Sequence, residues 1–271
     1  MNISLSPEIL FTIVGFPVTN TFIWTLAISL FLILVTLFIR IRNKEVPGRF
    51  QGFIEVLLEG AYSFVKSIIG IDKKAKRVFP LVFTMFILIL VANLIPYIPG
   101  QSAVTLGSGD EAVPVFRAVM SDYGFVFIMT MITVLLTQII AIITNGPFGY
   151  LGKFINLKGI KKFFIDAFKG KIRIGQFFQG FLDFFLGIMD IVGEVAKIVS
   201  LSFRLFGNIF ASEVLTAVML FLAPFIVPLP FMFLGLLTAV VQAFVFSVLT
   251  LIFISMASEI EEDPLAESVT P

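Results

Sequence analysis

The sequence predicts an all-α protein that crosses a membrane about five times, and two properties of the chain predict it. Of its 271 residues, 58% are hydrophobic and only 14% are charged, with a mean hydropathy of +1.06. Soluble domains carry roughly 25% charged residues, so most of this chain's surface must face lipid. The charges are also separated by gaps long enough for helices of about 20 residues to cross a bilayer. A cytosolic enzyme is therefore excluded.

The absence of two residue types narrows the possible chemistry. The chain has no cysteine, which excludes disulfides and thiolate metal sites, and no histidine, the usual proton carrier near neutral pH. A net charge of +1 provides no field that would attract nucleic acid. We therefore expect no cofactor, no metal ion and no nucleic acid.

Charge-free gaps predict the first three spans, because a charge inside the bilayer core is costly. These spans fall near 19–39, 78–98 and 123–145. Turn-forming residues close the second and third spans, Pro96 and Gly146 among them.

The C-terminal half of the chain predicts a long helical hairpin over 174–256. Its second arm contains a charge-free span near 231–256. The first arm, within 176–227, is apolar but differs from the other spans in carrying six charged side chains: Asp183, Asp190, Glu194, Lys197, Arg204 and Glu213. Prolines between the two arms predict the turn there.

The distribution of lysine and arginine predicts the orientation. Residues 1–18 have none and the loop 99–122 has one, whereas 40–77 has nine and 153–173 has seven. Cytoplasmic loops of membrane proteins are rich in these residues. We therefore expect the N-terminus outside and the acidic tail, 257–271, inside.

An amphipathic segment lies between the first two spans. Within 19–145, the region of the first three spans, residues 50–69 carry an apolar stripe on one helical face and polar side chains on the other. We expect a helix at the inner membrane interface, with an ordinary packing helix as the alternative. The whole chain, 1–271, is expected to form one membrane domain.

Arg204 is the most unusual residue of the charged arm, because an arginine at the centre of a membrane helix costs about 2.5–3.5 kcal/mol. Glu213 is nine residues away, about 13 Å along an α-helix and on its opposite side, which is too far for a direct pair. Lys197 lies on nearly the same face and repels it. We expect its partner in another subunit, with a buried ion pair inside this chain as the alternative.

Other polar groups of the hairpin each have a functional and a structural interpretation. Glu194 and Lys197 are three residues apart and can pair. Asp190 and Glu194 are either part of a functional site or simply solvated near the inner interface. A turn at Ala223 would bring Gln242 to the depth of Arg204, where its amide either accepts a hydrogen bond from the guanidinium or only links two helices, worth about 0.6 kcal/mol.

At these residues the sequence resembles the a subunits of F-type ATP synthases, the membrane stator beside a rotating ring of c subunits. The resemblance rests on the block Ser200–Asn208, SLSFRLFGN, on Glu213 nine residues after the arginine, and on QAFVF at 242–246. The run NLIP at 93–96 is a weaker match.

The resemblance implies a mechanism. Protons would enter an outer half-channel, protonate a ring carboxylate, travel with the ring and leave through an inner half-channel. Arg204 would favour the ionised ring carboxylate and block a direct leak. Glu213 and Asn208 would line the outer path, and Asp190, with Glu194 as a second candidate, the inner one.

The resemblance also implies the surroundings of the arginine and the partners of the chain. Ser200 and Gln242 would lie near Arg204, and the two last helices would tilt steeply. The partners would be the c-subunit ring, b-type peripheral stalk subunits, the remainder of the synthase and the lipid bilayer. The subunit would be non-catalytic and reside in a bacterial inner membrane, with an organellar inner membrane as the alternative.

One position departs from the family pattern. Some members carry a histidine or an acid on the last helix, seven residues before the glutamine, as partner of the outer glutamate. Here that position is Gly235. The outer path would then depend on Glu213, Asn208, Gln242 and water. Proton and sodium coupling both stay open, because the c subunit carries the ion-selecting site.

A stand-alone secondary transporter or ion channel, with Arg204 binding an anionic substrate, is the competing function. It predicts that the purified chain moves a solute by itself, whereas a stator has no function without a ring. The two halves of the chain have no matching pair of broken spans, which disfavours many transporter folds.

Overall fold

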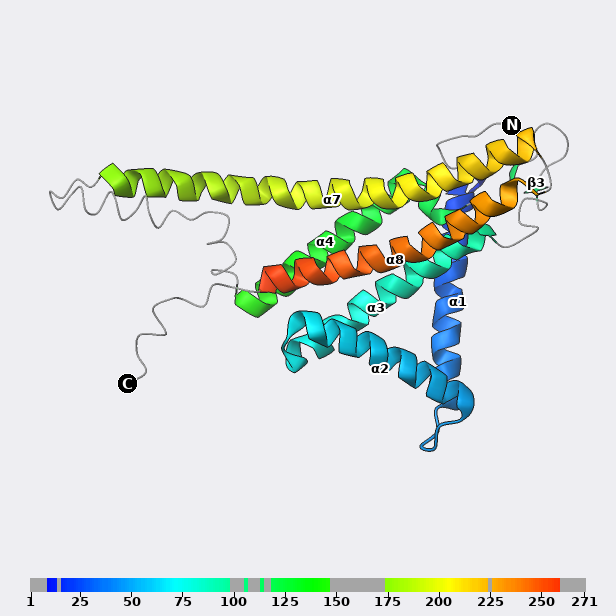
Figure 1. The fold of residues 1–271 in the computed structure, drawn as a ribbon, viewed down its shortest axis with the longest axis horizontal. Helices are drawn as coiled ribbons and strands as arrows, with labels where there is room; N and C mark the ends of the chain where they lie inside the picture. Colours follow the sequence, from blue (N-terminus) through cyan, green and yellow to red (C-terminus); the bar gives the residue numbers. More distant parts are fainter. Residues whose placement is uncertain are drawn as a thin grey trace. The chain divides into compact units, whose positions relative to one another are not determined.

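The computed structural model describes residues 9–13, 16–97, 105–106, 113–114, 118–146, 174–223 and 226–258. Six α-helices dominate these ranges (Figure 1): α1 Asn20–Arg42, α2 Arg49–Ile69, α3 Asp72–Leu94, α4 Tyr123–Asn145, α7 Ile174–Leu222 and α8 Pro228–Ser258. Two short 3-10 helices, η1 Ile95–Tyr97 and η4 Val119–Ser121, follow α3 and precede α4. The predicted inner loop 153–173 and most of the acidic tail lie outside the described residues.

Five helices of the described ranges are long and apolar enough to cross a membrane: Asn20–Arg42, Asp72–Tyr97, Tyr123–Ile143, Phe185–Leu222 and Pro228–Ala257. The predicted all-α, multi-pass membrane protein is thereby confirmed. The second span starts at Asp72 rather than at 78, because the charged residues ahead of the apolar stretch continue the same helix. Its first turns can stay helical outside the hydrocarbon core, where charges are solvated.

Two short strand pairs are present that the sequence reasoning did not predict. Strand β1 (Ile9–Ile13) pairs antiparallel with β2 (Phe16–Thr19), and β3 (Thr105–Leu106) pairs antiparallel with β4 (Val113–Pro114). The first pair is rich in isoleucine, phenylalanine, valine and threonine, which favour extended backbone. These pairs are local additions and leave the helical class unchanged.

The chain forms two compact units, which are considered separately. The first comprises residues 1–129 and 201–251, and the second comprises 130–200 and 252–271. Helices α4, α7 and α8 contribute residues to both units.

Within the first unit, the predicted amphipathic segment is the helix α2. Several apolar side chains on it, Phe53 and Val56 among them, are about 70% exposed, as an interfacial helix requires. Gly70 ends the helix with a φ of +76°, a conformation that costs glycine little, and its N–H donates to the Lys66 carbonyl at 2.9 Å. This sharp turn lets the chain enter α3 directly.

The α2–α3 corner is held by polar contacts around one carboxylate. Asp72 accepts a hydrogen bond from the Tyr62 hydroxyl at 2.9 Å and pairs with Lys66 at 2.9 Å and Lys76 at 3.1 Å. The hydrogen bond to the Asp72 carboxylate raises the pKa of Lys66, because it stabilises the charged ammonium. The Tyr62 ring packs edge-on against Phe79, with centroids 5.5 Å apart.

The predicted hairpin turn is confirmed by the helix ends. Helix α7 is continuous over 49 residues and ends at Leu222, and α8 begins at Pro228. Proline suits the first turn of a helix, because its missing N–H would have no partner there. Buried residues of the first unit lie on one face of each helix: Leu201, Leu205 and Ile209 of α7, and Ala239, Ala243 and Phe246 of α8.

Candidate functional site

A column of polar side chains, which we call the α7 column, runs along one face of α7 in the first unit. It consists of Arg204, Asn208 and Ser212, spaced by four residues and therefore by about 6 Å of helix rise. Arg204 and Asn208 are exposed, and Ser212 is half-buried. The column connects the mid-helix arginine with the end of α7 that approaches the turn into α8.

Helix α8 supplies a buried amide to the middle of this column. Asn208 Nδ2 donates to Gln242 Oε1 at 2.9 Å, and Gln242 is only 3% exposed. The sequence reasoning placed Gln242 at the depth of Arg204, and the structure brings it to Asn208, one helical turn away. Among the described residues, nothing bonds to Gln242 Nε2, so the buried amide keeps a donor available.

Helix α3 adds a second buried amide. Asn93, at the start of the NLIP run, is fully buried, and its Nδ2 donates to the Ala239 carbonyl of α8 at 3.4 Å. Its Oδ1 has no hydrogen-bond partner among the described residues. Asn93, which belongs to the weakest of the sequence matches, therefore contacts α8 three residues before Gln242.

The end of the column is a hydroxyl pair that the sequence reasoning missed. Tyr97 Oη and Ser212 Oγ lie 2.8 Å apart, a normal O–H···O distance. Both groups close over Gly235 of α8: a Cβ atom added there would collide with the two hydroxyl oxygens and lie 3.0 Å from the Tyr97 ring. The four-residue spacing of Ser212 from Asn208 was the signal available in the sequence.

Arg204 has no carboxylate partner in the part of the chain that the structure describes. The ion pairs found there join Lys66 and Lys76 to Asp72 and Lys197 to Glu194. The alternative of a buried intrachain ion pair at Arg204 therefore finds no support among these residues. Arg204 instead begins an exposed stripe of α7 that continues through Asn208, Ala211, Leu215 and Val218.

Glu213 sits beside the hydroxyl pair. It is exposed and directly follows Ser212 on α7. A carboxylate, a phenol and a serine hydroxyl are thus gathered at one end of the α7 column. All three can accept and release protons or hydrogen bonds.

The second unit contains the other predicted acids. Glu194 pairs with Lys197 at 2.8 Å, as their spacing predicted, and also accepts a hydrogen bond from the Gln138 amide of α4. The Lys197 ammonium lies 4.8 Å from the centre of the Phe253 ring. Asp190 and Ser200 are exposed, whereas the side chain of Asp183 lies outside the described residues.

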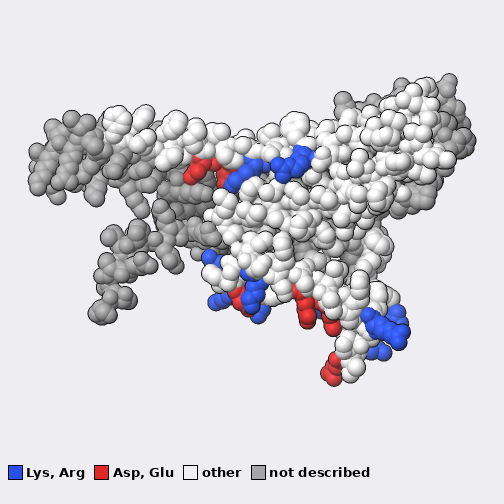
Figure 2. All heavy atoms as spheres, viewed as in Figure 1, with Lys and Arg blue, Asp and Glu red and all other residues white. Residues whose placement is uncertain are grey.

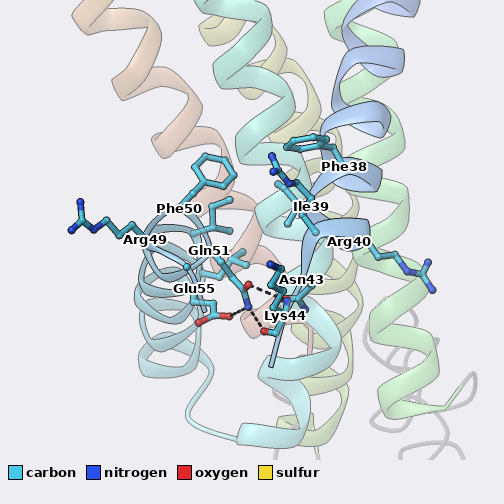
Figure 3. A pocket seen from close by; sticks show the side chains of 13 residues that line it. Phe38, Ile39, Arg40, Asn43, Lys44, Arg49, Phe50, Gln51 and Glu55 are labelled. Atoms are coloured by element: carbon cyan, nitrogen blue, oxygen red, sulfur yellow. Dashed lines mark hydrogen bonds between the residues drawn. The ribbon is translucent and has the colours of Figure 1, made fainter. Parts of the chain in front are cut away.

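A cavity in the first unit lies apart from this site. It has a volume of about 430 Å³ between the end of α1 and the start of α2, where Gln51 Nε2 donates to the Lys44 carbonyl at 2.9 Å (Figure 3). Arg40 and Arg49 point away from it in Figure 3. The charges visible in Figure 2 lie along α2, from the α1–α2 connection to the α2–α3 corner, with a further group along α7. No residue of the α7 column lines the cavity.

The gathered side chains are carboxylates, hydroxyls and amides. In the described ranges, no three acidic side chains come together in a way that could hold a metal ion. Carboxylates, hydroxyls and amides in a partly buried row can instead relay protons and orient water.

Comparison with known proteins decides the family. A model of the family described as ATP synthase A chain matches residues 20–255. The chain belongs to this family. The matched residues include four of the five described candidate spans in full and the fifth up to residue 255, together with the α7 column and the acidic groups of the second unit.

Individual relatives agree over nearly the whole chain. The chain is 32% identical to ATP synthase subunit a of Moorella thermoacetica over 250 residues, covering 92% of this chain and 95% of the relative. It is 33% identical to the subunit a of Geobacter sulfurreducens over 87% of this chain and 86% of the relative. The subunit a of Campylobacter concisus is 28% identical over 87% and 88% of the two chains.

Proposed function

We propose that this chain is the proton-translocating stator subunit of a rotary ATP synthase, forming two offset half-channels against a ring of c subunits. Family membership supports a place in an ATP synthase. The observation that carries the finer proposal is the position of Arg204. It is exposed on a membrane-spanning helix, has no described carboxylate partner, and stands at the end of a row of polar side chains.

The energetics of Arg204 favour a partner from outside the chain. A guanidinium at mid-membrane costs about 2.5–3.5 kcal/mol unless an anion or water compensates it. A ring carboxylate that passes Arg204 would supply the anion and would be held ionised by the nearby cation. Arg204 would thus release the carboxylate's proton and separate the two half-channels by a fixed positive charge.

The exposed stripe of α7 is the surface on which we place the ring. Leu215 and Val218, on the stripe beyond Arg204 and Asn208, are 36% and 39% exposed. Ala211 lies on the same stripe, and small side chains of this kind let a membrane helix approach closely. A ring helix packed here would present its carboxylate to Arg204 while lipid is excluded from the contact.

The outer half-channel follows the α7 column toward Arg204. Glu213 would receive protons from the outer side, and Asn208 with Gln242 would lead them to the ring. The donor of Gln242 Nε2 and the acceptor of Asn93 Oδ1 would bind water along this route. A membrane potential of 100 mV contributes about 2.3 kcal/mol for each proton that crosses.

The inner half-channel would begin beyond Arg204 and leave through the acids of the second unit, past Ser200. Asp190 is the stronger candidate, because it is exposed and no described cation pairs with it. Glu194 is held by Lys197 and Gln138, so its carboxylate is already engaged. Its role would be to keep the exit anionic rather than to carry the proton.

The remaining partners and the topology complete the proposal. The chain would contact b-type peripheral stalk subunits and the rest of the synthase, without catalysing ATP formation itself. It would lie in a bacterial plasma membrane, with its N-terminus outside and its C-terminus inside. Lysine and arginine counts in the loops support this orientation.

Co-purification tests the assignment as a whole. The tagged chain should co-purify from mildly solubilised membranes with a small, two-span, carboxylate-bearing protein in many copies, identified by mass spectrometry. The purified chain alone in vesicles should transport nothing. Solute transport by the isolated chain would instead support the stand-alone transporter.

Replacing Glu213 by glutamine should slow proton flux without stopping it. The variant keeps the shape of the side chain but cannot take up or release a proton, so water must carry protons past it. We expect a loss of roughly tenfold, about 1.4 kcal/mol in the barrier. The measurement is ATP-driven acidification of inverted membrane vesicles, and an unchanged rate would remove Glu213 from the path.

Replacing Asp190 by asparagine should slow flux more than replacing Glu194 by glutamine does. Asp190 is exposed, whereas Glu194 is tied to Lys197 at 2.8 Å. The same vesicle assay compares the two variants under equal assembly. A larger loss for Glu194→Gln would move the exit to the Glu194–Lys197 pair.

A further inference from the structure

We propose that Tyr97 and Ser212 are the proton relay of the outer half-channel and replace the side chain that Gly235 lacks. The inference rests on the proposed function and adds two residues to it. It begins from a steric fact, namely that Gly235 is buried and leaves no room for a Cβ atom. The atoms that exclude it belong to Tyr97 and Ser212, so the space beside Gly235 is filled by two hydroxyl groups.

The hydroxyl pair has the geometry of a proton wire. Tyr97 Oη and Ser212 Oγ are 2.8 Å apart, and either atom can be the donor. Each hydroxyl can accept one proton at its oxygen while it releases another. A pair of this kind passes protons without gaining net charge, which matters in a membrane interior.

The hydroxyl pair also lies between the two groups that an outer relay must connect, the outer carboxylate and the amides near Arg204. Glu213 directly follows Ser212 on α7, so the outer carboxylate is the sequence neighbour of one member of the pair. Ser212 stands one helical turn before the Asn208–Gln242 hydrogen bond, which leads on to Arg204. The pair therefore spans the interval between the outer carboxylate and the amides beside the arginine.

The transfer is balanced at each atom. Protonated Glu213 gives its carboxylic proton to a bridging water molecule, which passes a proton to Tyr97 Oη, while the proton of the Tyr97 hydroxyl passes to Ser212 Oγ. Ser212 releases its own proton to a water molecule beside Asn208. Both hydroxyls end neutral, Glu213 becomes a carboxylate that outer water can protonate again, and rotation of the two O–H bonds restores the starting arrangement.

Tyr97→Phe in the complete synthase tests the relay, because it removes the hydroxyl and keeps the ring that packs on Gly235. We expect ATP-driven proton pumping in inverted vesicles to fall about tenfold, which is less than the roughly 10²–10⁴-fold contribution of a positioned proton-transfer group, because water can enter in place of the hydroxyl. Ser212→Ala should fall by a similar factor, and the double variant should fall no further, because both changes cut one wire. Tyr123→Phe is the matched control, since this ring packs against Phe203 and Phe206 outside the pair, and it should leave pumping unchanged.

A rescue separates a relay from a purely structural role. Tyr97→Ala should pump poorly at every pH. Tyr97→Ala combined with Gly235→His places an imidazole in the space that the phenol leaves, with the Ser212 hydroxyl, which would also meet the new Cβ atom, rotated away. We expect the double variant to regain pumping with a new dependence on pH near 6.5, the ordinary pKa of histidine. A merely structural tyrosine would yield no such pH dependence.

The possible results distinguish failure of the proton relay from failure of the proposed stator function. Wild-type pumping in both Tyr97→Phe and Ser212→Ala would overturn the relay while leaving the stator function intact. Additive losses in the double variant would also overturn the relay. Failure of the proposed stator function would instead appear as ATP synthesis that is retained when Arg204 is replaced by alanine.

Discussion

Arg204→Ala should abolish proton-driven ATP synthesis while the synthase remains assembled. The substitution removes the cation that would hold a passing ring carboxylate ionised, so the proton would not be released at the inner half-channel. The exposed arginine makes no ion pair with the described residues of the chain, so its loss breaks no such pair. Synthesis driven by an imposed proton gradient in vesicles, with subunit composition checked by gel, measures both halves of the prediction.

Two further variants serve as a control and as a conservative substitution. Arg49→Ala removes the same side chain from the start of α2, where it points away from the nearby cavity, and should leave synthesis near the wild-type rate (Figure 3). Arg204→Lys keeps a positive charge but loses the planar guanidinium, and should retain only a small part of the activity.

Proton leakage adds a second readout. Vesicles with Arg204→Ala should become more permeable to protons, because no fixed charge then separates the two half-channels. A structural role for the arginine would not produce this leak together with full assembly. Retained synthesis in the assembled Arg204→Ala complex would contradict the mechanism.

Gly235→Ala should destabilise the first unit, although replacing glycine by alanine inside a helix usually stabilises it. The added methyl group would collide with the Tyr97 and Ser212 hydroxyls, and overpacking of this kind costs about 1–3 kcal/mol. The measurement is the midpoint of thermal unfolding of the purified chain in detergent, followed by loss of helical circular dichroism.

Gly60→Ala is the control for the same chemical change. Gly60 lies inside α2, and a Cβ atom there would meet no other atom within 4 Å. Alanine should therefore stabilise the helix by about 0.5–1 kcal/mol, since it loses less backbone freedom on folding. Opposite signs at the two glycines are the expected outcome, and equal effects would show that Gly235 is not tightly packed.

The fold could be predicted from the sequence to a large extent, because each span is set by local composition. A bilayer excludes charges from about 20 consecutive helical residues, so gaps between charges mark helices without knowledge of their neighbours. Span three was placed at 123–145, and α4 runs over Tyr123–Asn145. The strand pair β1–β2 was missed, because pairing of short extended segments depends on the partner strand as well as on composition.

The candidate site could be predicted only in part. Arg204, Asn208, Glu213 and Gln242 were identified, because a polar group in an apolar span is costly and therefore conspicuous. Tyr97 was not, since a tyrosine at the end of a span is ordinary in membrane proteins. Its significance depends on Ser212 and Gly235, which are more than 100 residues away in the chain.

The sequence by itself determined that the chain is a multi-pass helical membrane protein, where its spans lie and that Arg204 needs a partner. These conclusions depend on the free energy of placing each residue in lipid, which is a property of the residue and its neighbours along the chain. Only the tertiary structure decided that Gln242 bonds to Asn208 and that two hydroxyls occupy the space at Gly235. Contacts between side chains on different helices depend on helix rotation and packing, which composition and spacing do not specify.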